Sequence, residues 1–112
     1  MYLVTAIVKA HRVEAVTDSL KSVGVTGMTI ADVQGFGRQR GHTEVYRGSE
    51  YKVDFTPKVR VDVVCDSENA EKIADVIADA ARTGKIGDGK IWISEISRVI
   101  RVRTGETGTD AL

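Results

Sequence analysis

The chain has 112 residues, of which 42% are hydrophobic and 29% charged, and its single proline fits one globular domain rather than a disordered chain. Its 16 basic and 16 acidic residues cancel, so we expect no general attraction to nucleic acid or to a membrane surface. No apolar run approaches the roughly 20 residues of a membrane helix, and the N-terminus, MYLVTAIVKA, lacks the pattern of a signal peptide. With one cysteine, Cys65, that has no partner in the chain, these features predict a cytoplasmic protein.

The first part of the chain carries strand, helix and strand signals in turn. Residues 2–8, YLVTAIV, are apolar and β-branched, which predicts a strand. In residues 12–23 the apolar positions are spaced by three and four, as in an amphipathic helix, and Gly24 is expected to end it. Residues 28–36 alternate well enough to predict a second strand.

The same order returns in the second part. Residues 58–65 predict a strand with alternate apolar residues on one face, and residues 68–82 predict a helix with an inward stripe of alanine and isoleucine. Residues 90–96 predict a short strand, and residues 98–103, RVIRVR, another extended piece. Two strand–helix–strand halves predict an α+β, ferredoxin-like fold, with an antiparallel sheet and both helices on one face. Packing against other copies would cover the other face.

A polar connection over residues 37–56 joins the two halves. Structureless loops longer than about 12–15 residues are uncommon in compact domains and are usually functional or disordered. Within it, HTEVYRGSEY (42–51) carries hydroxyls at Tyr46, Ser49 and Tyr51. These hydroxyls are either displayed to a partner or simply solvated.

TGKIGDGK (83–90) is the first of three candidate anion-binding segments. It contains the spacing G-x-x-x-x-G-K, but position 91 is Ile where a P-loop has Ser or Thr, and the segment leads from a helix into a strand. Its three glycines allow backbone N–H groups to converge, and Lys90 adds a positive charge, which favours an anion site. The alternative is an ordinary turn with Gly84 as the helix cap.

The other two segments carry arginines. GFGRQRG (35–41) offers Arg38 and Arg40, although a solvated turn explains it equally well. In RVRTG (101–105), Arg101 and Arg103 are two apart on an extended segment, so both are expected on one side, either around an anion or paired with carboxylates. Together the three segments would form a polyphosphate pocket, in which each charged hydrogen bond is worth about 1.5–3 kcal/mol.

The evidence for catalysis is thin. His11 and His42 are the only histidines and lack metal-ligand spacing, and Cys65 has no evident activating partner. The sequence therefore favours a binding protein with no catalytic residues.

Four segments together resemble the PII nitrogen-regulatory signal-transduction proteins: GMT (27–29), GFGRQRGHTEVYRGSEY (35–51), TGKIGDGK (83–90) and RVIRVRTGE (98–106). The resemblance runs from the first strand to the C-terminus and implies a homotrimer of ferredoxin-like subunits. It implies one domain, 1–112, with a T-loop at about 37–55, a B-loop at about 83–90 and a C-loop at about 102–112. It also implies an allosteric regulator of nitrogen metabolism rather than an enzyme.

The resemblance implies that ATP and ADP compete for clefts between subunits, and that 2-oxoglutarate binds when MgATP is present. The implied nucleotide contacts are Thr29, Gly37, Arg38, Gln39, Val64, Gly87, Asp88, Gly89, Lys90, Arg101 and Arg103. The implied 2-oxoglutarate contacts are Lys9, Gly37, Gln39, Gly41, Lys58 and Gly87. Gln39 would also help to hold the magnesium ion.

The resemblance assigns the displayed loop to partners. They would be an ammonium transporter, whose pore Arg47 would enter, enzymes that control glutamine synthetase, and a nucleotidylyltransferase that modifies Tyr51. Phosphorylation of Ser49 is the alternative modification, and Tyr46 has no such role. Membrane contact would be indirect, through the transporter.

Two departures from the family pattern and two rival functions remain. Ala10 and His11 stand where Pro and an aromatic are common, and Asp62 where Glu is frequent, which is expected to alter a contact near the adenosine. The rivals are an enzyme that hydrolyses ATP in the same clefts and a metal-binding ferredoxin-like trimer.

Overall fold

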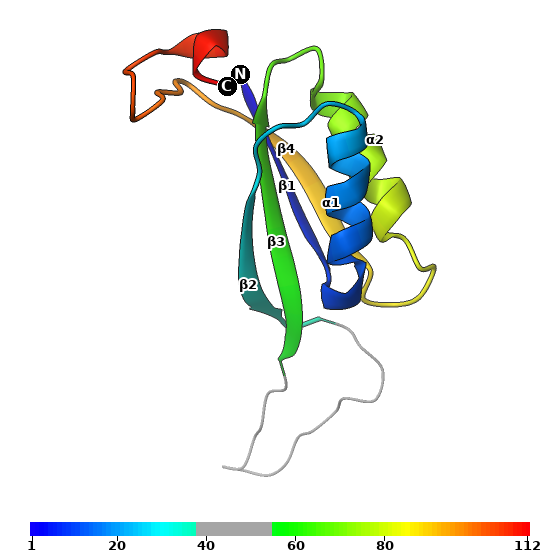
Figure 1. The fold of residues 1–112 in the computed structure, drawn as a ribbon. Coiled ribbons are helices and arrows are strands. Elements are labelled where there is room, and N and C mark those ends of the chain that lie inside the picture. The colour runs from blue at the N-terminus through cyan, green and yellow to red at the C-terminus, as the bar shows by residue number, and fades with distance from the viewer. Residues whose placement is uncertain (38–54) are drawn as a thin grey trace, which may run out of the picture.

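The computed structural model describes residues 1–37 and 55–112; residues 38–54 lie outside what it describes. Its elements, in chain order, are β1 (Tyr2–Lys9), a 3₁₀ turn η1 (Ala10–Arg12), α1 (Val13–Ser22), β2 (Thr29–Gly35), β3 (Thr56–Cys65), α2 (Ala70–Ala81), β4 (Gly89–Glu95) and a 3₁₀ turn η2 (Gly108–Ala111). The strands form one antiparallel sheet in the order β2-β3-β1-β4, and both helices pack on one of its faces (Figure 1). The predicted α+β, ferredoxin-like fold is confirmed.

The core lies between the sheet and the two helices. Alternate residues of β1 and β3 point toward the helices, so the predicted apolar face of β3 is confirmed. The predicted helix stripes are confirmed too, because α1 and α2 bury their apolar residues against this face. The buried residues of the core are Val4, Ala6, Val8, Val16, Leu20, Val59, Val61, Val63, Cys65, Ala70, Ile73, Ile77 and Ala81.

Gly24 ends the first helical segment as predicted. Its backbone has φ +95°, and its N–H donates to the Lys21 carbonyl at 3.0 Å, which reverses the chain after α1. The helix itself is shorter than residues 12–23, because residues 10–12 form the tighter η1 turn first.

The prediction of an extended piece over residues 98–103 is wrong. The chain turns at residues 102–104 and makes only one isolated bridge, between Ile100 and Thr107. Gly105, with φ +77°, donates its N–H to the Arg101 carbonyl and lets the chain reverse. Figure 1 shows this C-terminal segment projecting away from the sheet.

The face of the sheet opposite the helices carries apolar and polar side chains in rows. The strand register places Trp92, Thr5, Asp62 and Thr29 side by side across β4, β1, β3 and β2. Trp92 is 43% exposed, although a tryptophan normally buries most of its large ring. Among the described residues no helix covers this face.

Candidate ligand-binding site

Three of the residues predicted to contact 2-oxoglutarate meet at one end of the sheet. Lys9 and Lys58 are directly opposite in the register of β1 and β3. The Lys58 Nζ donates a hydrogen bond to the Gly87 carbonyl oxygen, which brings the loop after α2 to the same place. Gly37 follows the end of β2 at this end of the molecule, where the described chain stops (Figure 1). The chain alone therefore assembles a cluster of two cations and a glycine loop.

The cluster combines a buried cation with neighbouring charges of both signs. Lys58 is only 8% exposed. Burial, together with the charge of Lys9, lowers the pKa of Lys58, and Asp88 acts in the opposite direction. Like charges directly opposite in a sheet are unfavourable, and the Asp88 carboxylate, 3.2 Å from the Lys9 Nζ, offsets part of the repulsion between the two ammonium groups.

The loop over residues 83–90, the B-loop, is organised by Asp88. The Asp88 Oδ2 accepts hydrogen bonds from the N–H groups of Thr83 and Gly84, both at 2.8 Å. The Asp88 Oδ1 accepts the Thr83 hydroxyl at 2.5 Å and lies 3.2 Å from the Lys9 Nζ. The Thr83 hydroxyl and N–H hydrogen bonds, followed by those of Gly84 and Lys9, hold the pKa of Asp88 well below its ordinary value.

Gly84 does not cap the preceding helix, contrary to the alternative of a simple cap and turn. The C-cap of α2 is Arg82, which has extended backbone and donates its N–H to the Ala78 carbonyl. Gly84 has φ +84° inside the loop that Asp88 closes. The loop is therefore a built structure rather than a helix end.

Gly89 fixes where the B-loop enters β4. Its φ is +108°, and a Cβ placed on it would lie 1.7 Å from the Ile7 carbonyl oxygen, so only glycine fits. The next residue, Lys90, is opposite Ile7 and lies on the face of the sheet away from the helices. This close approach places the Lys90 side chain beside the loop.

Thr29 and Val64 lie elsewhere. Val64 is opposite Leu3 near the other end of β1, and Thr29 is opposite Asp62, in line with the middle of β1. Both line a cavity of about 630 Å³ between the start of β2, the end of β3 and the C-terminal residue, Leu112. Asp62 also lines it, but its carboxylate accepts hydrogen bonds from the Thr5 hydroxyl at 2.7 Å and the Arg60 Nε at 2.9 Å. Burial acts to raise the pKa of Asp62, and these hydrogen bonds lower it overall. Asp62 is thus held in the sheet at the edge of the cavity.

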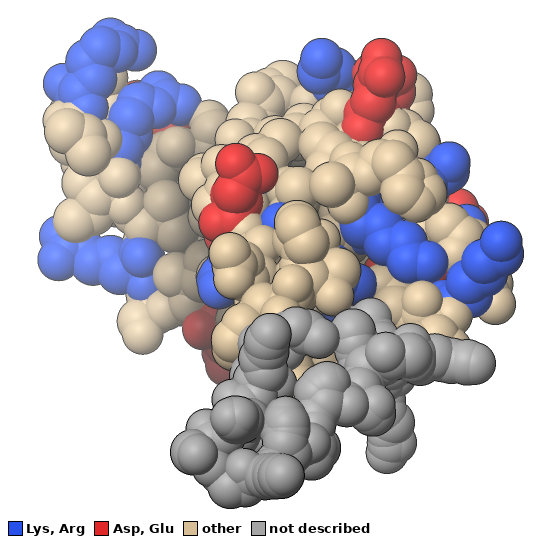
Figure 2. All heavy atoms as spheres, turned by 90° about the horizontal axis from the view of Figure 1, so that it is seen from below, with Lys and Arg blue, Asp and Glu red and all other residues tan. Residues whose placement is uncertain are grey.

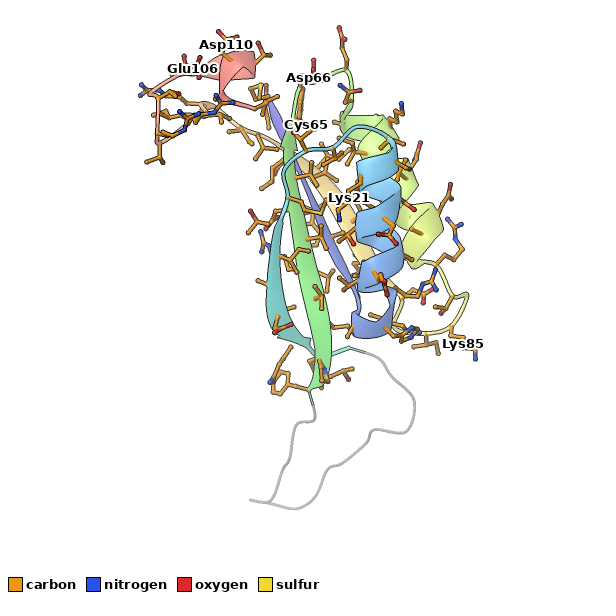
Figure 3. The ribbon with its side chains drawn as sticks, viewed as in Figure 1. Lys21, Cys65, Asp66, Lys85, Glu106 and Asp110 are labelled. Atoms are coloured by element: carbon orange, nitrogen blue, oxygen red, sulfur yellow. The ribbon has the colours of Figure 1, made fainter. Side chains whose placement is uncertain are left out.

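Arg101 and Arg103 do not project from an extended segment, so the geometry predicted for them is wrong. Arg103 is in the turn of residues 102–104. Arg101 donates to the Glu106 Oε1 at 2.8 Å and to the Leu112 carbonyl oxygen at 2.7 Å. The alternative of pairing with a carboxylate is confirmed for Arg101. Figure 3 shows Glu106 on this projecting segment, away from Lys85 in the B-loop.

The predicted nucleotide-binding residues that the structure describes fall into separate groups within one chain. Lys90 is on β4 and Thr29 on β2, three strand spacings apart in the sheet, which is on the order of 14 Å. Figure 2 shows basic side chains at several separate places on this view rather than in one patch. Lys90 and Thr29 therefore lie apart within one chain.

The remaining predicted residues lie outside the described part of the chain. These are Arg38, Gln39, Arg40, Gly41, His42, Tyr46, Arg47, Ser49 and Tyr51.

Two functional features were not predicted from the sequence. Thr83 was not singled out, although its hydroxyl accepts from Lys85 N–H and Lys9 Nζ while donating to Asp88. The sequence feature that could have indicated it is a threonine, Thr83, five residues before Asp88 with two glycines between them. The second is the ordered bond of Asp62 to Thr5, which needs the strand register and cannot be seen in the sequence.

Three further features of the described residues concern metal sites, membrane-spanning helices and thiol reactivity. Residues 1–37 and 55–112 contain no group of three or more His, Cys, Asp or Glu arranged to hold a metal ion. In those same ranges no helix is both long and apolar enough to cross a membrane. Cys65 is buried, and burial, followed by the charge of Asp66, raises the pKa of its thiol, as expected for a small core residue.

The sequence matches known proteins along its whole length. The family model "Nitrogen regulatory protein P-II" matches residues 1–106. A protein named nitrogen regulatory protein P-II from Rhizobium meliloti (strain 1021) is 54% identical, and one named nitrogen regulatory protein GlnK from Escherichia coli (strain K12) is 51% identical. Each alignment spans 112 residues and covers 100% of both chains.

The fold matches as well. The crystal structure of Arabidopsis thaliana PII bound to citrate has a TM-score of 0.82 and 39% sequence identity, and the match covers 99% of this chain and 91% of that one. The names of the family and its members are those of regulatory signal proteins rather than enzymes. The chain belongs to the P-II family of nitrogen regulatory proteins.

Proposed function

We propose that this protein is a non-enzymatic cytoplasmic sensor that binds ATP or ADP, and 2-oxoglutarate together with MgATP, in clefts between the subunits of a homotrimer. The sensor would report the carbon, nitrogen and energy state of the cell to partner proteins. The proposal extends membership of the P-II family to particular ligands and residues.

The observation that carries the proposal is the meeting of Lys9, Lys58 and Gly87 at the root of the long loop. Two lysines face each other there, and one of them is almost fully buried. A dicarboxylate carries two negative charges on a short carbon chain, so it satisfies both ammonium groups at once. The citrate bound to the PII protein of Arabidopsis thaliana is also a small polycarboxylate, which supports this choice of ligand class.

The separation of the nucleotide residues supports clefts between subunits. One copy would supply the B-loop and Lys90, which would bind the phosphates. Another would supply the cavity of Thr29 and Val64 for the base, and the arginines of the C-terminal segment would complete the phosphate site. The partly exposed Trp92 on the open face supports packing of the sheets against one another in a trimer.

Magnesium would be held at the root of the T-loop by Gln39, the nucleotide phosphates and 2-oxoglutarate. The lysine cluster fits this group, because its cations would neutralise the ligand carboxylate and phosphate oxygens that surround the ion. When bound, the ion would supply positive charge that offsets the charges of the nucleotide phosphates and the ligand carboxylate. The residues of this chain would orient both ligands from the lysine side.

The T-loop would carry the signal. It begins next to Gly37 and ends next to Lys58, so ligand bound at this root would select among its conformations by a coupling of about 1–3 kcal/mol. Residues 42–55 would then engage an ammonium transporter through Arg47, or the enzymes that control glutamine synthetase. Tyr51 would be the site of nucleotidylation, with Ser49 as an alternative site of phosphorylation.

The absence of catalysis is part of the proposal. Asp88, the carboxylate within the B-loop, already accepts three hydrogen bonds and pairs with Lys9, so it is poorly placed to act as a base. A turnover assay should show no fast ATP hydrolysis that depends on Lys90. Fast hydrolysis lost in Lys90→Ala would instead establish the enzyme.

The test of the ligands is calorimetry on the full chain, in which 2-oxoglutarate is titrated with and without MgATP. We expect binding only with MgATP, and a loss of at least tenfold in 2-oxoglutarate affinity in Lys58→Met, about the value of one charged hydrogen bond. Lys21→Met, on the exposed side of α1, is the matched control and should bind as the unaltered chain does. Equal binding of 2-oxoglutarate without MgATP would refute the shared site.

A further inference from the structure

The B-loop contains a small hydrogen-bonded unit made by Thr83 and Asp88, the latch. The two carboxylate oxygens of Asp88 divide their partners: one binds the two backbone N–H groups of Thr83 and Gly84, and the other binds the Thr83 hydroxyl and Lys9. The latch therefore closes the ring of residues 83–88 at both of its ends.

The latch occupies two backbone N–H groups of the loop and so limits which donors can bind an anion. The N–H groups of Thr83 and Gly84 point at Asp88, so they are not directed at a ligand. At the other end of the loop, the Gly87 carbonyl oxygen accepts a hydrogen bond from Lys58. The chain then passes through Gly89, where no side chain fits, into β4. The anion would then meet the part of the loop that leads into Lys90.

The loop needs such a restraint. Gly84, Gly87 and Gly89 all have positive φ, and glycine loses more conformational freedom on ordering than any other residue. A loop without the latch would sample many shapes, and a ligand would have to order it on binding. Lys9, which donates to the Thr83 hydroxyl at 3.2 Å as well as pairing with Asp88, ties the latch to β1.

We propose that Thr83 and Asp88 are positioning residues, which hold the B-loop in its anion-binding shape before ligand arrives and orient Lys9 toward the loop. Neither side chain touches the nucleotide. Asp88 then contributes to the predicted nucleotide site through the loop it closes, not through its carboxylate. The inference rests on the proposed function of the B-loop as a phosphate site and names the residues that prepare it.

The test compares four variants of the full chain. Thr83→Val removes the hydroxyl and keeps the shape, Thr83→Ser restores the hydroxyl, and Asp88→Asn removes the charge and one acceptor. Asp79→Asn is the matched control, since Asp79 forms an exposed ion pair with Arg82 at 3.3 Å outside the loop.

Two readouts are needed, and a urea midpoint serves as the check on folding. The first is hydrogen exchange of the Thr83 and Gly84 amides in the ligand-free chain, and the second is ATP affinity by calorimetry. We expect at least tenfold faster exchange and about tenfold weaker ATP binding in Thr83→Val, and a larger loss in Asp88→Asn. Thr83→Ser and Asp79→Asn should match the unaltered chain. In Thr83→Val and Asp88→Asn the urea midpoint should shift only slightly, because the latch is exposed, so the loss of ATP affinity should exceed the loss of stability.

Unchanged exchange and unchanged ATP affinity in both Thr83→Val and Asp88→Asn would overturn the latch. An ATP affinity that falls only in step with the urea midpoint would also overturn it, because that pattern belongs to a general loss of folding. If the unaltered chain does not bind ATP, the proposed function fails, and the exchange comparison by itself decides whether the latch exists.

Discussion

The B-loop and the C-terminal segment of residues 98–112 are both predicted to bind phosphate, but they differ in how firmly the rest of the chain holds them. The B-loop is tied to the domain by Asp88, Lys9 and Lys58 and enters the sheet at a position that only glycine fits. The C-terminal segment projects from the sheet, and its Arg101 pairs with carbonyl and carboxylate oxygens of the same segment. Val102, at its turn, is 97% exposed.

The difference separates the part of the proposed site that one chain holds in shape from the part that it does not. A loop whose donors and acceptors are satisfied within the domain keeps its shape without a partner. A projecting segment with an exposed valine has less to hold it within its own chain, and in the proposed assembly a neighbouring copy would support it. The contrast between the two segments supports the proposal that the nucleotide site lies between copies.

Among the substitutions that test this difference, Gly89→Ala is expected to have the largest effect on stability and ATP binding. The new Cβ would overlap the Ile7 carbonyl oxygen, so β4 must shift at its start and carry Lys90 with it. We expect a loss of several kcal/mol in the free energy of unfolding, in the range of severe backbone and packing changes, and loss of ATP binding.

Gly84→Ala is the control for that change, to be followed by urea unfolding and calorimetry. Its φ is also positive, but a Cβ there meets no atom within 4 Å, so the cost should be only about 1–2 kcal/mol. Equal effects of the two substitutions would show that the contact with β1 does not define the loop.

A smaller effect is expected when acid protonates Asp88. Its pKa in the folded chain is depressed below the ordinary value of 3.8, so its contribution to stability is present above that value and is lost as pH falls below it. The difference in urea midpoint between the unaltered chain and Asp88→Asn should stay constant above about pH 5, well above the pKa of about 3.9 of a free aspartate, and should shrink at lower pH.

A difference in urea midpoint that grew as pH fell would have the wrong sign. It would show that the charged carboxylate of Asp88 is unfavourable in the folded chain. The B-loop would then not be held by its aspartate.

The smallest effect is expected in the C-terminal segment. Glu106→Gln removes the charge opposite Arg101 in an exposed ion pair, which contributes about 0–1 kcal/mol to stability. The urea midpoint should change little, and ATP should bind as well as before or better, since Arg101 is released for phosphate. A large loss of stability would mean that this segment, like the B-loop, is fixed by its own chain.

Most of the fold was predictable because the spacing of apolar residues along the chain indicates each strand and helix. Val59, Val61 and Val63 alternate along a strand, and Ile73 and Ile77 repeat along a helix, and both patterns match the buried core. The prediction of an extended segment over residues 98–103 was wrong because the positive φ of Gly105 and the backbone hydrogen bonds of Arg101 reverse the chain there. Apolar content alone does not reveal such a turn.

The candidate site was predictable only in part. The glycines and Lys90 of the B-loop indicated an anion site, but the closing role of Thr83 depends on hydrogen bonds between residues on either side of a turn. The facing of Lys9 and Lys58 depends on strand register, which joins residues 49 apart in the chain. Such pairings follow from the tertiary structure and not from any local pattern.

The most direct test of the central claim, a nucleotide site shared between copies, is a mixing experiment. Chains carrying Lys90→Ala and chains carrying Arg103→Ala are co-expressed with different tags, and assemblies that contain both are isolated. In a mixed assembly one cleft combines both intact residues and another combines both substitutions. We predict that each variant alone binds ATP at least tenfold more weakly, and that the mixed assembly regains high-affinity sites at a fraction of its clefts. A mixed assembly that binds as weakly as either variant alone would contradict the account.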